Sequence, residues 1–228
     1  QKLKSDFVAN VSHELRTPLQ SIKLGLETIN SGPAKDDLNS QKKIMPLILQ
    51  QTSRMENIVN DLLSLSRIEL QEHIKPNEDV DINEIISHSI ELHSEILKKK
   101  GIACNFEKKT TNGKFKGDRN RLIEVFNNLI DNAVKYSEKN TKINLLAKDD
   151  NKNISIVIKD EGIGIAREHI PKITERFFRV NPEKSKEAGG TGLGLAIVKH
   201  IVNQHRGEMQ ITSEEGKGTE ISLIFPKN

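Results

Sequence analysis

Apolar residues in the first third of the chain recur at alternating spacings of three and four residues. The first run comprises Val8, Val11, Leu15, Pro18, Ile22 and Ile29, and the second comprises Ile48, Met55, Ile58, Leu62 and Leu65. Such heptad spacing is typical of coiled coils and four-helix bundles. The turn-forming residues 31–37 between the runs predict an antiparallel helical hairpin. Because two helices bury only one seam, we expect two copies of the hairpin to associate as a homodimeric four-helix bundle.

After residue 75 the periods become shorter and mixed. The predicted elements are a helix from about Asn83 to Lys100 ended by Gly101, a strand at 102–106, a helix from Asp118 to Tyr136, a strand hairpin at 143–158, a glycine-led helix from Gly192 to His205 and a final hairpin at 209–225. Strands with helices on one side predict a two-layer α/β sandwich. We therefore predict a helical dimerisation domain at residues 1–75, a linker at 76–80 and an α/β domain at 81–228.

Composition and charge argue against several classes of function. The formal net charge of the 228 residues is +3, and neither half forms a basic module, so we expect no nucleic-acid partner. The single cysteine, Cys104, excludes a disulfide framework and any multi-cysteine zinc site. No apolar run approaches the roughly 20 residues that span a bilayer. Because the chain also lacks a signal-peptide pattern and an initiator Met, we expect a soluble piece of something longer.

His13 falls on the outward face of the first predicted helix, opposite the apolar seam. A histidine in such a place is commonly a solvated bystander, but its neighbours favour chemistry. Glu14 is adjacent and could polarise an imidazole N–H, as a general base does. Thr17 lies one turn further on the same face. Pro18 cannot donate to the carbonyl of Glu14, which loosens the helix beside the histidine.

A later helix carries a candidate cation and phosphate site. Asn128 and Asn132 are four residues apart and therefore face one way. An ordinary polar helix face would give the same pattern. Asparagine is a weak helix former, however, so its repetition here invites a functional explanation. Carboxamide oxygens suit Mg²⁺, which binds nucleotide phosphates, and Lys135 would add a phosphate counter-charge.

Two glycine-rich segments complete the candidate chemistry. Asp160 ends a predicted strand just before Gly162 and Gly164, which reads either as an ordinary turn or as a carboxylate beside backbone that lets a flat ligand approach closely. The segment Gly189–Leu195 precedes a helix, where free N–H groups and the helix dipole can hold phosphate. It has neither the lysine ending of a P-loop nor the strand and ribose-binding acid of a dinucleotide site.

Taken in order, these segments resemble the sensor histidine kinases of two-component signalling. The matching segments are Phe7–Leu19 (phosphoacceptor box), Asn128–Tyr136 (asparagine box), Asp160–Ile165 (first glycine box), Glu175–Val180 (phenylalanine box), Gly190–Leu195 (second glycine box) and Gly216–Thr219 (terminal glycine motif). The resemblance covers essentially the whole chain. Within the family, residues 32–34 and 60–69 are most similar to the phosphate-regulon sensor kinases of alphaproteobacteria.

The resemblance implies roles for individual residues. Asp160 would accept a hydrogen bond from the adenine amino group of ATP, with Tyr136 and Ile165 near the base, and residues 180–189 would form a mobile lid. The implied catalytic residues are His13, Glu14 and Thr17. The implied nucleotide ligands are Asn128, Asn132, Lys135, Tyr136, Asp160, Gly162, Gly164, Ile165, Gly190, Thr191, Gly192, Leu193, Gly194, Leu195 and Thr219, with Asn128 and Asn132 as the Mg²⁺ ligands.

The resemblance also implies the reaction and the partners. The γ-phosphoryl group of ATP would pass to His13 and then to an aspartate of a response regulator, and Thr17 would support dephosphorylation of that regulator. The chain would be the cytoplasmic portion of an inner-membrane-anchored bacterial protein, with membrane contact only through segments outside this sequence. Two alternatives are a catalytically silent dimeric scaffold and an ATP-driven conformational clamp. The His13 box on a heptad hairpin argues against the clamp, which has no use for it.

Overall fold

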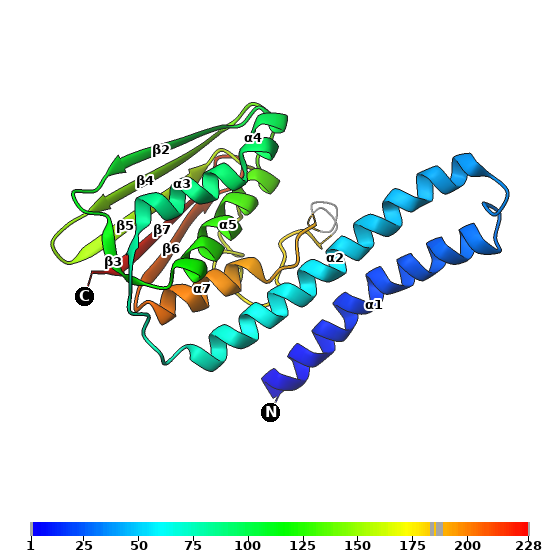
Figure 1. Cartoon of the computed structure of the whole chain (residues 1–228), viewed down its shortest axis with the longest axis horizontal. Coiled ribbons are helices and arrows are strands. Elements are labelled where there is room, and N and C mark those ends of the chain that lie inside the picture. The colour runs from blue at the N-terminus through cyan, green and yellow to red at the C-terminus, as the bar shows by residue number, and fades with distance from the viewer. Residues whose placement is uncertain (1, 183–184, 186–188, 228) are drawn as a thin grey trace.

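The chain folds into a long helical hairpin joined to an α/β sandwich (Figure 1). The computed structural model describes residues 2–182, 185 and 189–227, and side chains from residue 7 onward. The elements of the hairpin are α1 (Lys2–Asn30) and α2 (Leu38–Gln71). The sandwich contains β1 (Glu78–Asp81), α3 (Ile82–Leu92), α4 (Ser94–Lys100), β2 (Ala103–Lys109), β3 (Lys114–Gly117), α5 (Arg119–Tyr136), β4 (Lys142–Asp149), β5 (Asn153–Asp160), α7 (Gly194–Gln204), β6 (Glu208–Glu214) and β7 (Gly218–Pro226).

The predicted apolar seam holds the two helices of the hairpin together. Ile58 is fully buried and Ile48 is nearly so, although only one chain is present. Asp37 caps α2 because its carboxylate accepts a hydrogen bond from the backbone N–H of Asn39, at 2.9 Å. One chain covers this seam only in part, because Val8 is 61% exposed and Val11, Leu15 and Met55 are only half-buried.

A second apolar stripe lies beside the seam and is exposed. On α2 it consists of Met45, Leu49, Val59 and Leu63, whose spacings of four, ten and four residues keep them on one helix face. On α1 Leu19 and Leu26 are also exposed and are one heptad apart. Large apolar side chains gathered on one exposed helix face, here in two pairs separated by Thr52 and Glu56, mark a candidate interaction site in a soluble protein. The exposed stripe and the partly exposed seam together favour association with a second copy.

The sandwich is built on a five-stranded mixed sheet with helices on one face. The strand order is β2-β4-β5-β7-β6, in which β2 and β4 are parallel and the other pairs are antiparallel. Helices α3, α5 and α7 cover one face of this sheet (Figure 1). Their apolar faces and the inward residues of β4, β5 and β7 share one buried cluster that includes Phe126, Ile156 and Phe225. The predicted two-layer sandwich is confirmed.

Local differences from the sequence expectation have local causes. The helix expected from about Asn83 to Lys100 is broken at His93, which leaves the α-region and whose Nδ1 lies 2.8 Å from the carbonyl oxygen of Ser89. The ending at Gly101 is confirmed, with the left-handed backbone expected of a glycine cap. Strands β1 and β3 form a separate two-stranded sheet. Each has only four residues, too few for an alternating pattern to be recognised in the sequence.

In the described part of the chain no helix combines the length and apolarity that a membrane span needs.

Candidate functional site

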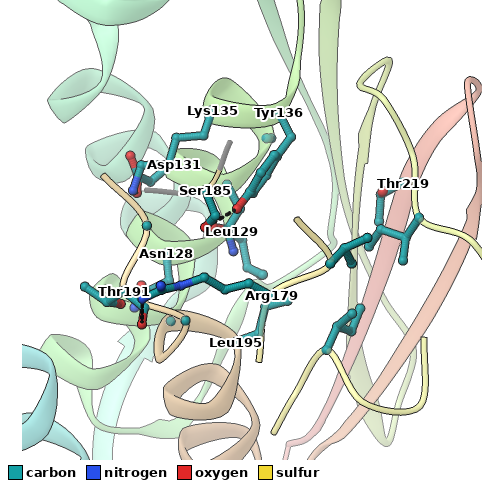
Figure 2. Close-up of a pocket in the computed structure, with 18 of the residues that line it drawn as sticks. Asn128, Leu129, Asp131, Lys135, Tyr136, Arg179, Ser185, Thr191, Leu195 and Thr219 are labelled. Carbon is teal, nitrogen blue, oxygen red and sulfur yellow. Dashed lines mark hydrogen bonds and ion pairs between the residues drawn. The ribbon is translucent and has the colours of Figure 1, made fainter. Parts of the chain in front are cut away.

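A cavity of about 610 Å³ opens where the sandwich meets the hairpin. Figure 2 shows the side chains of α5 and of the loops before α7 turned toward it. Of the nucleotide ligands implied by the sequence, all but Gly162 and Leu193 line this cavity. Leu193 instead belongs to the buried apolar core. The hairpin also contributes, because Asn57, Asn60 and Asp61 of α2 form part of the wall.

One end of the cavity is apolar around a single carboxylate. Asp160 lies among Ile158, Ile163 and Ile221 in the lining. Its Oδ1 accepts hydrogen bonds from the backbone N–H groups of Gly162 (2.8 Å) and Thr219 (3.2 Å). Burial raises the pKa of Asp160 above its usual value, and the two backbone hydrogen bonds oppose that rise. With Oδ1 occupied, Oδ2 can accept a donor on a planar ligand.

Glycines bring the backbone close to this carboxylate. Gly164 has φ +68°, and a Cβ on it would lie 2.0 Å from the carbonyl oxygen of Glu214. Gly218 has φ +94°, and a Cβ there would lie 2.0 Å from the carbonyl oxygen of Asp160. A Cβ on Gly162 would lie 2.7 Å from the carbonyl oxygen of Tyr136. Gly162 therefore shapes the wall from behind although it does not line the cavity.

The other end of the cavity is polar. Asn128 donates through Nδ2 to the carbonyl of Glu124 at 3.0 Å, which leaves its Oδ1 available beside Asn132 one turn on. Lys135 pairs with Asp131 at 2.6 Å, and the remaining N–H donors of its ammonium group can meet a phosphate in the cavity. Within the described residues there is no group of three or more His, Cys, Asp or Glu side chains fit to hold a metal. Two carboxamide oxygens nevertheless fit Mg²⁺, which takes its remaining ligands from phosphate oxygens and water.

The glycine-rich turn before α7 forms the rim of the polar end. Gly192 has φ +77°, and a Cβ there would lie 2.9 Å from Cα of Phe177. Helix α7 begins at Gly194 with no side-chain cap, so its first N–H groups are free to bind an anion. The hydroxyl of Thr191 accepts from the N–H of Leu193 at 3.2 Å and donates to Asp61 of the hairpin at 2.6 Å. Burial raises the pKa of Asp61, and the hydrogen bond from Thr191 opposes the rise.

Part of the segment that the resemblance assigns to a lid can be placed. The hydroxyl of Ser185 lies 3.2 Å from that of Tyr136, and the carbonyl of Ser185 accepts from the N–H of Gly190 at 2.8 Å. Residues 183–184 and 186–188 of the predicted lid lie outside the described residues. The described part of the segment therefore extends along the cavity toward Tyr136.

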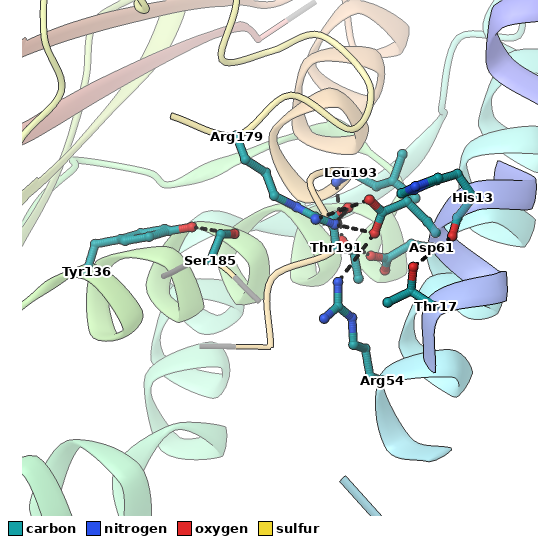
Figure 3. A network of polar contacts seen from close by, with 10 residues as sticks. His13, Thr17, Arg54, Asp61, Tyr136, Arg179, Ser185, Thr191 and Leu193 are labelled. Atoms are coloured by element: carbon teal, nitrogen blue, oxygen red, sulfur yellow. Dashed lines mark hydrogen bonds and ion pairs between the residues drawn. The ribbon is translucent and has the colours of Figure 1, made fainter. Parts of the chain in front are cut away.

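His13 lies beside this site (Figure 3), because the adjacent residue Glu14 is hydrogen-bonded to Arg179 of the cavity wall. The carboxylate of Glu14 accepts from Arg54 of α2 at 3.3 Å and from Arg179 of the sandwich at 2.9 and 3.3 Å. Arg179 also donates to the carbonyl of Thr191 at 2.7 Å and lines the cavity. His13 itself is exposed, and the hydroxyl of Thr17 donates to its backbone carbonyl at 3.3 Å. In the described structure no hydrogen bond joins the His13 ring to Glu14.

Three residues of this arrangement were not singled out from the sequence. Asp61 and Arg54 lie on α2, and Arg179 lies in the segment Glu175–Val180. Arg54 lies one helical turn before the seam residue Ile58, and an arginine so near a buried face is usually paired. That position is the signal by which the sequence could have identified it. The partner of Arg179 is 165 residues away along the chain, and no local pattern reports such a distance.

A hairpin that carries an exposed histidine, placed beside a glycine-bordered cavity in an α/β sandwich, defines the catalytic core of a histidine kinase. Residues 3–71 match the family model of the His Kinase A (phospho-acceptor) domain. Residues 117–228 match that of the histidine kinase-, DNA gyrase B- and HSP90-like ATPases. The chain belongs to the histidine kinases.

Known proteins of this family resemble the whole chain. The sensor protein kinase WalK of Staphylococcus aureus is 37% identical over 228 residues, covering 99% of this chain and 54% of that relative. The histidine kinase AdeS of Acinetobacter baumannii has a TM-score of 0.74 at 28% identity, covering 95% of this chain and 98% of that one. The histidine kinase ThkA, solved in complex with the response regulator TrrA, has a TM-score of 0.75 at 26% identity, covering 98% and 61%. The chain thus spans about half of WalK, or 37% of the WalK of strain JH9.

Proposed function

We propose that this chain transfers the γ-phosphoryl group of ATP to His13 and passes it on to an aspartate of a response regulator. The observation that carries the proposal is the hydrogen bond between Arg179 and Glu14. Arg179 lines the cavity, and Glu14 is the neighbour of His13. The cavity and the phosphoacceptor helix are therefore in direct contact through charged side chains. A silent scaffold or a nucleotide clamp gives no reason for this contact.

The chemistry follows from the positions of the side chains. Adenine would donate its amino hydrogen to Asp160 among the isoleucines, and the phosphates would reach toward Asn128, Lys135 and the free N–H groups at Gly194. Mg²⁺ held by Asn128 and Asn132 would neutralise phosphate charge. A ring nitrogen of His13 would then form a bond to the γ-phosphorus while the bond from that phosphorus to the ADP oxygen breaks. Positioning and charge neutralisation supply most of the rate in such transfers.

The proton released by the His13 ring would pass to Glu14 or to water. Glu14 can serve in this role only if its carboxylate is not fully engaged by Arg54 and Arg179. Transfer of the proton to Glu14 therefore requires a change in the arginine contacts of that carboxylate. For dephosphorylation of the regulator, the hydroxyl of Thr17 would release the carbonyl of His13 and orient a water toward the aspartyl phosphate of the docked regulator.

Assembly and context complete the proposal. The exposed stripe of Met45, Leu49, Val59 and Leu63 would pair with a second copy to form a four-helix bundle. WalK, which this chain matches over part of its length, is named a sensor kinase, and by analogy we expect the chain to be the cytoplasmic part of a membrane-anchored protein. The response-regulator partner is supported by the complex of ThkA with TrrA. The finer resemblance to phosphate-regulon kinases rests on residues 32–34 and 60–69 alone and stays a prediction.

The proposal is tested by incubating the protein with γ-labelled ATP and Mg²⁺. We expect an acid-labile phosphate on the parent protein, as for a phosphohistidine. His13→Ala should abolish the label while ATP binding, measured by calorimetry, stays near the parent value, because the His13 side chain does not line the cavity. Label that persists on His13→Ala would contradict the assignment of His13. A parent that binds ATP but never becomes labelled would favour the scaffold or clamp.

A further inference from the structure

The carboxylate of Glu14 is shared by two buried arginines from different parts of the molecule. Arg54 reaches it from α2 and Arg179 from the loop that borders the cavity (Figure 3). The side chains of Arg54, Arg179 and Glu14 are only 8%, 5% and 15% exposed. The three groups are therefore largely removed from water, where unpaired charge is costly.

The charges in this cluster do not balance. Two guanidinium groups face one carboxylate, and the nearby Asp61 accepts its hydrogen bond from Thr191 instead. The Nε atoms of both arginines are buried and have no hydrogen-bond partner in the described structure. Burial lowers the pKa of Arg54 first, and the charge of Arg179 lowers it further, while Glu14 opposes both effects. Because one arginine would suffice to neutralise Glu14, the presence of both Arg54 and Arg179 suggests that one of them also serves another anion.

The two arginines differ in what else they can reach. Arg179 lines the cavity and already donates to the carbonyl of Thr191 in the glycine-rich turn, so it can move to an anion in the cavity. Arg54 does not line the cavity, and in the described structure it donates a hydrogen bond to Glu14. When a triphosphate draws Arg179 away, one arginine and one carboxylate remain beside His13.

Resting on the function proposed above, we propose that Arg54 is a positioning residue for Glu14. Arg179 exchanges Glu14 for the phosphates of the bound nucleotide, and Arg54 keeps the carboxylate next to His13 during phosphoryl transfer. Arg54 contacts neither the nucleotide nor the His13 ring, so its whole effect on the reaction passes through Glu14. The contrary interpretation is that Arg54 only stabilises the hairpin, in which case its loss would not depend on Glu14.

The test is a double-mutant cycle on His13 labelling with Arg54→Met, Glu14→Ala and the double variant. We expect Arg54→Met to lower the maximal rate about 10²-fold, the typical loss when a catalytic group is misplaced by an ångström. The KM for ATP should change less than about threefold, because the cavity keeps its lining. In the Glu14→Ala background Arg54→Met should cost less than about threefold, because coupled residues do not add. Lys43→Met, an exposed cation on the same helix, is the matched control.

Conservative variants keep the inference testable if Arg54→Met does not fold. Arg54→Lys retains one donor and should recover part of the rate, whereas Arg54→Gln should not, and each is run with and without Glu14→Ala. Rate losses that multiply in the double variants, a loss confined to KM, or parental rates in Arg54→Met would each overturn the role of Arg54. Failure of the proposed function looks different, because then the parent protein itself carries no label on His13.

Discussion

At the scale of single residues, Asp160 is partly buried and accepts two hydrogen bonds, both on the same carboxylate oxygen. The backbone N–H groups of Gly162 and Thr219 both donate to Oδ1, and Ile158, Ile163 and Ile221 line the cavity with this carboxylate. The carboxylate is thus fixed in orientation by its own loop before any ligand arrives. A ligand that donates to Oδ2 therefore loses little conformational freedom at this contact.

We expect Asp160→Asn to weaken ATP binding by about 10–100-fold. The amide can place an N–H against the adenine amino group, and a mismatched buried polar pair costs about 1–3 kcal/mol. Calorimetric titration with ATP measures the effect. Asp150→Asn, in the exposed turn between β4 and β5, serves as control. An affinity for ATP equal to that of the parent would place the base elsewhere.

Residues such as Asp160 and Asn128 could be predicted because each stands in a short contiguous motif whose chemistry is local. Arg54 and Arg179 could not, because their shared partner Glu14 is 40 and 165 residues away. Helical periodicity gives the face on which Arg54 lies but not what is packed against that face. Long-range polar contacts of this kind depend on how the two parts of the chain dock, and docking leaves no periodic trace in the sequence.

Helix α2 shows at the element scale how one helix can serve two contacts. Its seam face, with Ile48 and Ile58, packs on α1, and its exposed stripe includes Val59 and Leu63. Sequence periodicity identified the helix and its seam. It did not separate the seam from the adjacent stripe, because each stripe residue directly follows an apolar residue, as Val59 follows Ile58.

The two faces of α2 predict opposite outcomes for neighbouring substitutions. Leu63→Asp or Val59→Asp should yield a folded monomer, because charge on the exposed stripe opposes pairing of two copies. Ile58→Asp should instead disrupt the hairpin, since an unpaired charge would be buried inside one chain. Analytical ultracentrifugation reports the mass and circular dichroism the helix content. A parent protein that is monomeric at micromolar concentration would contradict the proposed bundle.

At the scale of the whole molecule, the α/β sandwich is docked on the hairpin of the same chain. Apolar contact is made by Leu65 and Ile68 of α2, which belong to the core cluster of the sandwich. Polar contacts surround it, among them Arg121 with Ser64 at 2.9 Å and Arg176 with Glu69. At the other end of the interface Arg179 meets Glu14. Each chain therefore presents its own cavity to its own phosphoacceptor helix.

This arrangement predicts phosphoryl transfer within one chain. A His13→Ala chain and an Asp160→Ala/Asn128→Ala chain, carrying different tags, would be coexpressed and the mixed dimer isolated with both tags. We expect no labelling of the mixed dimer, because the chain that binds ATP has no acceptor of its own. In a dimer of a parent chain with the Asp160→Ala/Asn128→Ala chain, only the parent chain should become labelled. Labelled His13 on the Asp160→Ala/Asn128→Ala chain would show transfer between chains.

Tyr136 is the only tyrosine of the sequence, and the sequence has no tryptophan. The side chain stands in the cavity wall with its hydroxyl 3.2 Å from that of Ser185. Essentially all near-ultraviolet emission of the unmodified protein thus comes from one ring in the candidate nucleotide site. Displacement of Ser185 or stacking of a base should change that emission, and free tyrosine titrated in parallel corrects for light absorbed by adenine. The protein therefore contains its own optical reporter of site occupancy.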